Sequence, residues 1–248
     1  MNEENDIKIS VLCPTRKRPS LMRTVAENCF KTCEDPEQIE LVFGLDDDDT
    51  VSIEQAQLLQ QEMKPYKIEY TIWEAGKYVF SDLINQCSKP AKGEIFNIMS
   101  DDGVHQTKNW DTKILEIFED SYKDKIILVQ TAGGANAQTG FPFVHRNWRD
   151  TVGYILAPIF HGDWADYWLA DVLKGLGGDR FIYRADITIK HNHVEFGLMD
   201  ADETYKKHIK ERKEQEKLPK SEHPYHGHTG QEMKRLEIEK LKNFINTF

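Results

Sequence analysis

Short apolar runs alternate with amphipathic stretches along most of the chain. Five of these runs are rich in β-branched and aromatic residues and predict buried strands: Ile7–Leu12, Ile39–Leu45, Ile68–Trp73, Ile95–Met99 and Ile126–Thr131. The stretches between them carry apolar residues at helical spacing, which predicts helices of about a dozen residues. Such alternation is typical of an α/β protein with a mostly parallel sheet.

The helical pattern is clearest in five segments. One begins at Pro19, and the others are Ser52–Met63, Val79–Cys87, Trp110–Phe118 and Trp164–Leu173. Two further strands are predicted at Phe181–Tyr183 and Ile187–Ile189. Beyond Asp200 the composition becomes highly charged, with helical patterns at Thr204–Lys217 and Gln231–Phe248. We therefore expect an α/β domain over residues 1–200 and a charged helical extension over residues 201–248.

Polar residues follow three of the predicted strands, as Pro14-Thr15-Arg16, Asp46–Asp49 and Ser100-Asp101-Asp102. The carboxyl ends of parallel strands meet at one edge of a sheet, where ligands bind in α/β folds. Two adjacent carboxylates would repel each other unless a cation joined them, and their hard oxygens suit Mg²⁺ or Mn²⁺ on a diphosphate. The alternative is a solvated turn, since Asp-Asp-Gly is common in turns.

Two further groups of residues are candidates for chemistry. His191 and His193 end a predicted strand and alternate along it, so only one faces a given side. An imidazole beside carboxylates suits Mn²⁺ better than Mg²⁺, although a structural histidine is the commoner case. Asp163 and Asp166 stand at the start of a predicted helix. They either complement the helix dipole or supply a general base.

Composition and motifs exclude several classes of protein. The 248 residues include 32 basic and 42 acidic ones, for a net charge of −10, which argues against a surface that grips nucleic acid as a whole. The acidic first residues lack the regions of a signal peptide, and no apolar run is long enough to span a bilayer, so we expect a cytoplasmic protein. Four cysteines without a CxxC pair predict core thiols. Neither GxGxxG nor a P-loop motif occurs.

The residues Ile9–Arg16 resemble the opening strand of the GT-A glycosyltransferases, especially the large family-2-like group. The resemblance implies a Rossmann-like fold, with a mostly parallel central sheet and flanking helices. It also implies that the donor meets Pro14, Thr15, Arg16, Asp46 and Asp101, with Asp46 at the base or ribose. Ser100-Asp101-Asp102 resembles the DxD motif of that family, with Ser100 in place of the first Asp and Asp102 as the main metal ligand.

The rest of the resemblance lies further along the chain and extends it over roughly residues 7–195. The stretch Ala165–Leu169 is similar to the Glu-Asp-x-x-Leu helix of the family, which puts Asp166 at the position of the catalytic base. Ala165 replaces the usual acidic neighbour, so Asp163 is a rival for that role. His193, or alternatively His191, matches the histidine that completes the metal site in some members.

The resemblance implies a metal-dependent glycosyltransferase that uses Mn²⁺ or Mg²⁺. It would move a sugar from a nucleotide-sugar, a UDP-sugar by preference, to an acceptor hydroxyl with inversion. The acceptor is a glycan, a lipid-linked sugar or a hydroxymethylated DNA base; small enzymes of this type occur in bacteriophages. Residues 206–220 hold seven basic side chains against three acidic ones, which indicates either a solvated helix face or a surface that steers an anionic acceptor.

Other interpretations remain open at this point. Leu41–Leu45 followed by Asp46 and Asp48 also matches the hhhhDxDxT motif of haloacid-dehalogenase-like phosphatases, although that motif normally ends the first strand. A non-catalytic nucleotide-sugar binding protein is a third class. Three tryptophans, Trp148, Trp164 and Trp168, either stack on a ligand or pack in the core. The histidines 223, 226 and 228 either bind a metal or belong to a flexible loop.

Overall fold

The computed structural model describes all residues except 1–6, 136–139, 162–163, 193 and 195–196. Its first half alternates strands and helices: β1 (Ile9–Pro14), α1 (Pro19–Thr32), β2 (Ile39–Asp46), α2 (Thr50–Glu62), β3 (Lys67–Trp73), α3 (Phe80–Ser88) and β4 (Ile95–Ile98). The remaining elements are β5 (Gly103–His105), α4 (Trp110–Glu119), β6 (Leu128–Ala132), β7 (Phe143–His145), α5 (Arg146–Val152), α6 (Ala165–Leu176), β8 (Phe181–His191), α7 (Glu203–Glu216) and α8 (His228–Ile245).

The strands form one eight-stranded sheet in the order β3-β2-β1-β4-β7-β6-β8-β5. The pairs β3–β2, β2–β1, β1–β4 and β6–β8 are parallel. The short strand β7 runs antiparallel to β4 and β6, and β5 runs antiparallel to β8. The predicted α/β class with a mostly parallel sheet is therefore confirmed.

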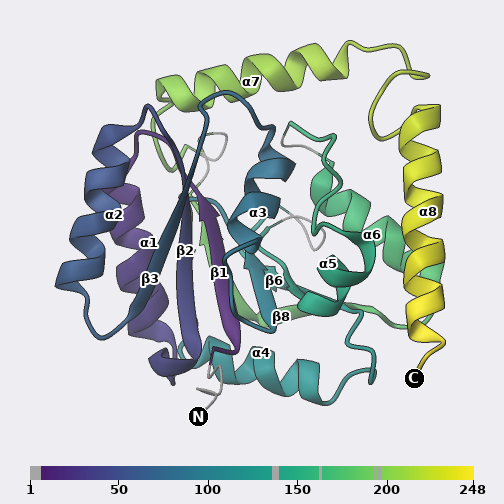
Figure 1. The fold of residues 1–248 in the computed structure, drawn as a ribbon, viewed down its shortest axis with the longest axis horizontal. Helices are drawn as coiled ribbons and strands as arrows, with labels where there is room; N and C mark the ends of the chain where they lie inside the picture. The colour runs from purple at the N-terminus through teal and green to yellow at the C-terminus, as the bar shows by residue number, and fades with distance from the viewer. Residues whose placement is uncertain (1–6, 136–139, 162–163, 193, 195–196) are drawn as a thin grey trace.

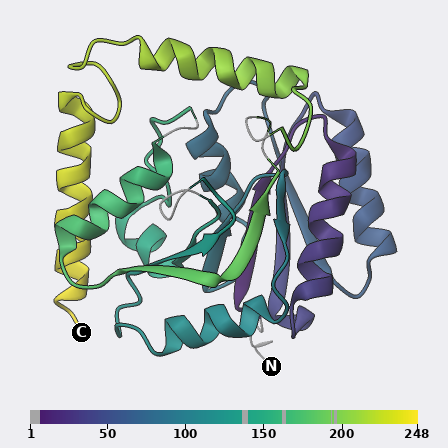
Figure 2. The ribbon, with the colours of Figure 1, turned by 180° about the vertical axis from the view of Figure 1, so that it is seen from behind.

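Helices cover both faces of the sheet, and the alternation of side chains along the strands explains why (Figures 1 and 2). In β1, Val11 and Cys13 belong to a core that includes residues of α1, α2 and α4. Leu12, between them, faces the opposite way and belongs to a second core with residues of α3, α5 and α6. Because both faces are buried, the strand reads as a continuous apolar run rather than as an alternating one.

The structure differs from the sequence-based expectation in its second half. Phe181–Tyr183 and Ile187–Ile189 are parts of a single long strand, β8, whose register against β6 shifts once along the pair. The strands β5 and β7 and the helix α5 were not predicted. Two three-residue strands and a two-turn helix are too short to show a hydrophobic period.

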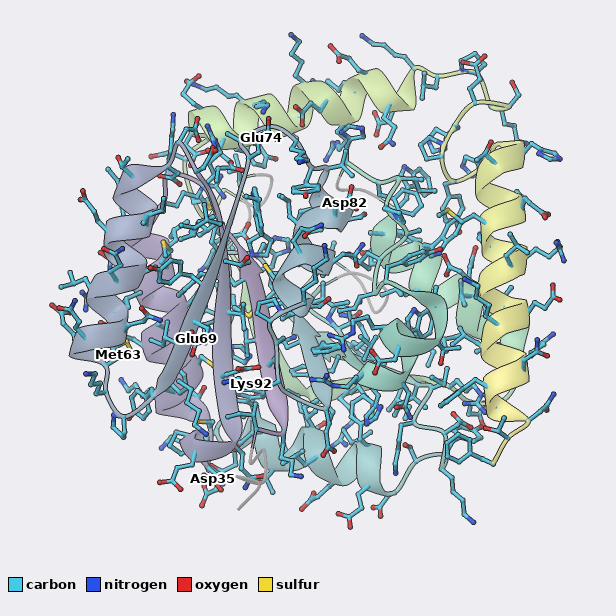
Figure 3. The ribbon with its side chains drawn as sticks, viewed as in Figure 1. Asp35, Met63, Glu69, Glu74, Asp82 and Lys92 are labelled. Atoms are coloured by element: carbon cyan, nitrogen blue, oxygen red, sulfur yellow. The ribbon has the colours of Figure 1, made fainter. Side chains whose placement is uncertain are left out.

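The carboxyl ends of the parallel strands lie at the edge of the sheet that faces α7 (Figure 1). In Figure 3, Glu74, the residue after β3, lies at that edge, whereas Lys92, shortly before β4, lies toward the opposite one. Helix α4 runs along the opposite edge. The segments Pro14-Thr15-Arg16 and Ser100-Asp101-Asp102 follow β1 and β4, so both lie on the side of α7.

The two C-terminal helices form where the charged patterns predict them, and both contact the preceding part of the chain. Asp202 caps α7, accepting a hydrogen bond from the Tyr205 backbone N–H at 2.8 Å. Helix α8 packs beside α5 and α6 (Figure 1) and buries Glu237, whose side chain is only 2% exposed. A domain boundary near residue 200 stays a prediction. No helix in the described part of the chain has the length and apolar character needed to cross a bilayer.

The buried carboxyl of Glu237 predicts a pH-dependent stability. It accepts hydrogen bonds from Tyr154 Oη at 2.6 Å and from Trp168 Nε1 at 3.0 Å, but burial outweighs them and raises the pKa of Glu237 from 4.5 to about 7. The folded state therefore holds more protons than the unfolded state between these values. This residue should lower the free energy of unfolding as pH rises from 4.5 to 7, by at most about 1.4 kcal/mol per pH unit.

We expect Glu237→Gln to remove that contribution, because the neutral amide oxygen still accepts both hydrogen bonds. Urea unfolding at several pH values between 4.5 and 8 measures it. The exposed Glu239→Gln on the same helix is the matched control and should keep the slope of the unchanged protein. Equal slopes for Glu237→Gln and the unchanged protein would contradict this assignment.

Candidate functional site

A cavity of about 800 Å³ lies at the carboxyl ends of β1, β2 and β4, between the first turn of α6 and helix α7. It brings together every predicted site residue that the structure describes: Pro14, Thr15, Arg16, Asp46, Asp101, Asp102, Asp166 and His191. Asp163 and His193 lie outside the described residues. Residues more than 170 positions apart in the sequence thus share one cavity, as the strand-end argument requires.

Asp101 is bound on both of its oxygens. The Thr15 hydroxyl donates to Oδ2 at 2.6 Å and Arg18 Nη1 donates to Oδ1 at 2.8 Å. Burial nevertheless raises the pKa of Asp101 to about 6; Arg18 and Thr15 lower it, and the neighbouring Asp102 raises it further. With both oxygens held by the protein, Asp101 fixes the ends of β1 and β4 to each other at the floor of the cavity.

Asp102 pairs with His191. The imidazole Nε2 lies 3.1 Å from Asp102 Oδ2, and the Ser100 hydroxyl donates to the other oxygen. This contact exists because β5 directly follows the acidic pair and runs antiparallel to β8, with Gly103 opposite His191. The backbone N–H of Asn192 also donates to the Asp102 carbonyl at 2.9 Å. The unpredicted strand β5 is therefore what brings the histidine to the carboxylate.

Asp102 and His191 together have the chemistry to bind a divalent cation. A carboxylate oxygen and an imidazole nitrogen on one side of the cavity are a donor set suited to Mn²⁺. Within the described residues, no group of three or more His, Cys, Asp or Glu side chains is arranged to hold a metal.

Arg16 and Trp73, which also line the cavity, both contact Asp46, the last residue of β2. Arg16 forms an ion pair with Asp46 and donates to both oxygens of Asp48, at 2.6 and 2.7 Å. These carboxylates raise the pKa of Arg16, and in turn Arg16 lowers the pKa of Asp48. Trp73 Nε1 donates to Asp46 Oδ1 at 2.7 Å. The result is a polar edge with one indole ring and a network of charge-assisted hydrogen bonds.

Asp166 lies in the first turn of α6, on the wall of the cavity. Its Oδ1 accepts from the Tyr167 backbone N–H at 2.9 Å, and its side chain is half-buried. The helix starts after Trp164, whose φ of 75° turns the chain sharply into it. The apolar residues of α6 pack into the core, which holds the first turn and its carboxylate in place.

The three tryptophans have different roles in the fold. Trp148 and Trp168 are each 1% exposed and pack in the core, so neither lies free to stack on a ligand. Trp164 is half-buried and lines the cavity beside Asp166. Only Trp164, of these three, is placed to contact a bound molecule.

Several residues of the site were missed in the sequence. Arg18 bridges Asp101 and Asp202: besides its bond to Asp101, it donates to both oxygens of Asp202, at 2.6 and 2.8 Å. Arg18 stands beside Arg16 and Lys17 in the sequence, but its partner Asp202 is 184 residues away, so no local pattern indicates the pair. The N-terminal half of α7 also lines the cavity through Thr204 and Tyr205. No local pattern indicates that a charged helix closes a cavity.

Comparison with known sequences gives one distant relative. No protein-family model matches the chain. The O-antigen biosynthesis protein RfbC of Myxococcus xanthus is 24% identical over 223 residues, an alignment that covers 77% of this chain and 16% of that protein. The chain thus spans about a sixth of the length of its curated relative.

Comparison with solved structures gives neighbours that cover between 74% and 98% of this chain. A mannosyltransferase from Pyrobaculum calidifontis, solved with GDP-Man and Mn²⁺, has a TM-score of 0.64 at 12% identity and covers 97% of this chain and 73% of its own. Residues 1–349 of Staphylococcus aureus TarS, solved with UDP-GlcNAc, have a TM-score of 0.57 at 12% identity, covering 98% and 73%. The same TarS fragment with UDP reaches 0.58 at 13% identity, covering 74% and 59%. At these identities the shared property is the fold, and this chain has the GT-A fold of those glycosyltransferases.

Proposed function

We propose that this protein is a glycosyltransferase that uses Mn²⁺ or Mg²⁺ and moves a sugar from a nucleotide-sugar to a hydroxyl group of a glycan. The observation that carries the proposal is one cavity that contains three kinds of group. It holds a carboxylate–imidazole pair (Asp102 and His191), a carboxylate on a helix start (Asp166) and a polar edge with an indole (Asp46 and Trp73). These are the parts that a metal-assisted transfer from a nucleoside diphosphate needs.

The donor is proposed to lie along the strand ends. Its base or ribose would meet Asp46 and Trp73, and its diphosphate would lie beside Asp102 and His191, with Pro14 and Thr15 below it. A bound divalent cation supplies positive charge that stabilises the leaving nucleoside diphosphate. Asp102 and His191 would hold that cation, and Asp101 would keep the two strand ends together. His193 stays a further candidate ligand.

Asp166 is proposed as the general base, with Asp163 as its rival. The carboxylate would take the proton from the acceptor hydroxyl while the oxygen attacks the anomeric carbon and the bond to the diphosphate breaks. One displacement of this kind inverts the configuration at that carbon. Bases of this type contribute about 10²–10⁴-fold to the rate. The packed start of α6 supports the assignment, because a base must be held in position.

Names of the similar proteins support the substrate class. The structural neighbours were solved with GDP-Man and Mn²⁺, with UDP, and with UDP-GlcNAc. The distant relative is named for O-antigen biosynthesis. We therefore propose a UDP-sugar or GDP-sugar as donor and a saccharide as acceptor.

The phosphatase interpretation has less support. A nucleophilic aspartate needs an oxygen that is open to the phosphorus atom, and cation pairing weakens it as a nucleophile. Here Asp46 is bound by Trp73 and Arg16, and Asp48 is bound by Arg16.

A non-catalytic nucleotide-sugar binding protein would have no need for a positioned carboxylate at Asp166.

Thermal unfolding with a panel of nucleotides tests the proposal. We expect UDP, UDP-GlcNAc, GDP or GDP-Man to stabilise the protein, more strongly with Mn²⁺ than with EDTA. A ligand at a hundred times its Kd adds about 2.7 kcal/mol to the free energy of unfolding. No response to any nucleotide, together with hydrolysis of p-nitrophenyl phosphate in Mg²⁺, would refute the proposal in favour of the phosphatase.

A further inference from the structure

The cavity of about 800 Å³ at the strand ends is called the donor cavity below. A second cavity, of about 540 Å³, adjoins it at the C-terminal end of α7. It lies between the last turns of α7, the loop that leads to α8 and the first turn of α8, a corner visible at the upper right of Figure 1. His161 and Glu211 line both cavities, so the two share a wall. Its volume is within the about 300–1,000 Å³ typical of ligand sites.

One part of the lining of the second cavity is packed against the fold, whereas Glu214, Leu218 and Glu222 are exposed. Gln215, which is 7% exposed, donates from Nε2 to the Ile159 carbonyl at 3.1 Å and so docks α7 on the segment before α6. The connecting loop is closed by backbone hydrogen bonds, such as Gly227 N–H to the His223 carbonyl at 2.7 Å. A Cβ at Gly230 would lie 1.7 Å from the Pro224 carbonyl oxygen. The loop therefore packs directly on α8, which holds this part of the lining in place.

The charge of the second cavity is one-sided. Three glutamates line it, Glu211, Glu214 and Glu222, and the described lining residues include neither Lys nor Arg. Lys207 lines the neighbouring cavity instead, where its ammonium lies 3.8 Å from the carboxylate of Glu211, so Glu214 and Glu222 are the glutamates that carry the negative charge of the second cavity. Carboxylates accept hydrogen bonds from hydroxyl and ammonium groups and repel phosphate and carboxylate groups.

We propose that the second cavity binds part of the acceptor saccharide. The sugar rings that occupy it carry no negative charge. This inference rests on the proposed function and specifies its acceptor. The hydroxyl that reacts lies at Asp166 in the donor cavity, and the remaining rings pass His161 and Glu211 into the second cavity. There Glu214 and Glu222 accept hydrogen bonds from sugar hydroxyls or amines. The apolar faces of the rings meet Ile159 and Leu218, which also line it.

Binding of defined trisaccharides to the protein loaded with UDP and Mn²⁺ tests this. The probes are maltotriose, mannotriose and triacetylchitotriose as uncharged saccharides, chitosan trimer as a cationic one and trigalacturonic acid as an anionic one. We expect saturation-transfer NMR to show binding of at least one uncharged or cationic probe and none of trigalacturonic acid. Glu214→Gln and Glu222→Gln should each weaken that binding about tenfold, the loss expected for a hydrogen bond to a charged group.

Two variants complete the design. Glu203→Gln changes a glutamate of α7 that is 90% exposed and lines neither cavity, so it should leave saccharide binding unchanged. Thr229→Tyr, in the first turn of α8, should narrow the cavity and weaken saccharide binding while UDP still binds. Binding of trigalacturonic acid alone, binding of no probe, or indifference to all three cavity variants would overturn the inference. Failure of UDP to bind the unchanged protein would instead refute the proposed function.

Discussion

Asp166→Asn should lower kcat by about 10²–10⁴-fold and leave the affinity for the donor nucleotide unchanged. Asparagine keeps the size of the side chain and its amide oxygen still accepts from the Tyr167 N–H, so the start of α6 stays formed. What is lost is the ability to take a proton from the acceptor hydroxyl. Steady-state kinetics with the donor found in the nucleotide screen measure the effect, with UDP release as the signal.

The control for this prediction is Asp179→Asn. Asp179 is exposed beyond the end of α6 and lines neither cavity. The kcat of the Asp179→Asn variant should therefore equal that of the unchanged protein. Full activity of Asp166→Asn would transfer the role of base to Asp163. A loss of UDP affinity in Asp166→Asn would show that the carboxylate holds the donor instead.

Asp102→Asn should remove most of the effect of Mn²⁺ on nucleotide binding. Substitution of residues that only orient a metal ligand costs about 10–100-fold in metal affinity, so loss of a ligating carboxylate should cost at least that. Ser100 and His191, whose side chains contact the Asp102 carboxylate, remain in place. Titration of UDP with increasing Mn²⁺, followed by calorimetry, gives the metal dependence directly.

Comparison with Asp101→Asn separates the two acidic residues. Asp101 is held by Thr15 and Arg18, so its substitution should lower stability and leave the dependence of UDP binding on Mn²⁺. His191→Ala should resemble Asp102→Asn, because both belong to the same pair. The assignment of the metal site would fail if UDP bound Asp102→Asn with the Mn²⁺ dependence of the unchanged protein.

The predicted strands agree with the structure best where the signals are local. β1 and β2 are long, β-branched and almost completely buried, so a short window of sequence identifies them. Thr15 and Asp101 each follow one of the predicted parallel strands. Their placement in one cavity could therefore be predicted, because parallel strands bring their carboxyl ends to one edge of the sheet. β5 and β7 were missed because three residues carry no period, and they exist only through pairing with β8, β4 and β6.

The α/β class, the charged residues at the strand ends and the two C-terminal helices can be predicted from the amino-acid sequence, since each depends on neighbours within about one helix or strand. The folded chain was needed to show that His191 meets Asp102, that Arg18 joins Asp101 to Asp202, and that α7 lines both cavities. These contacts join residues 89, 83 and 184 positions apart. Each forms because the sheet and helices pack as a whole, and no local propensity or period encodes such a pairing.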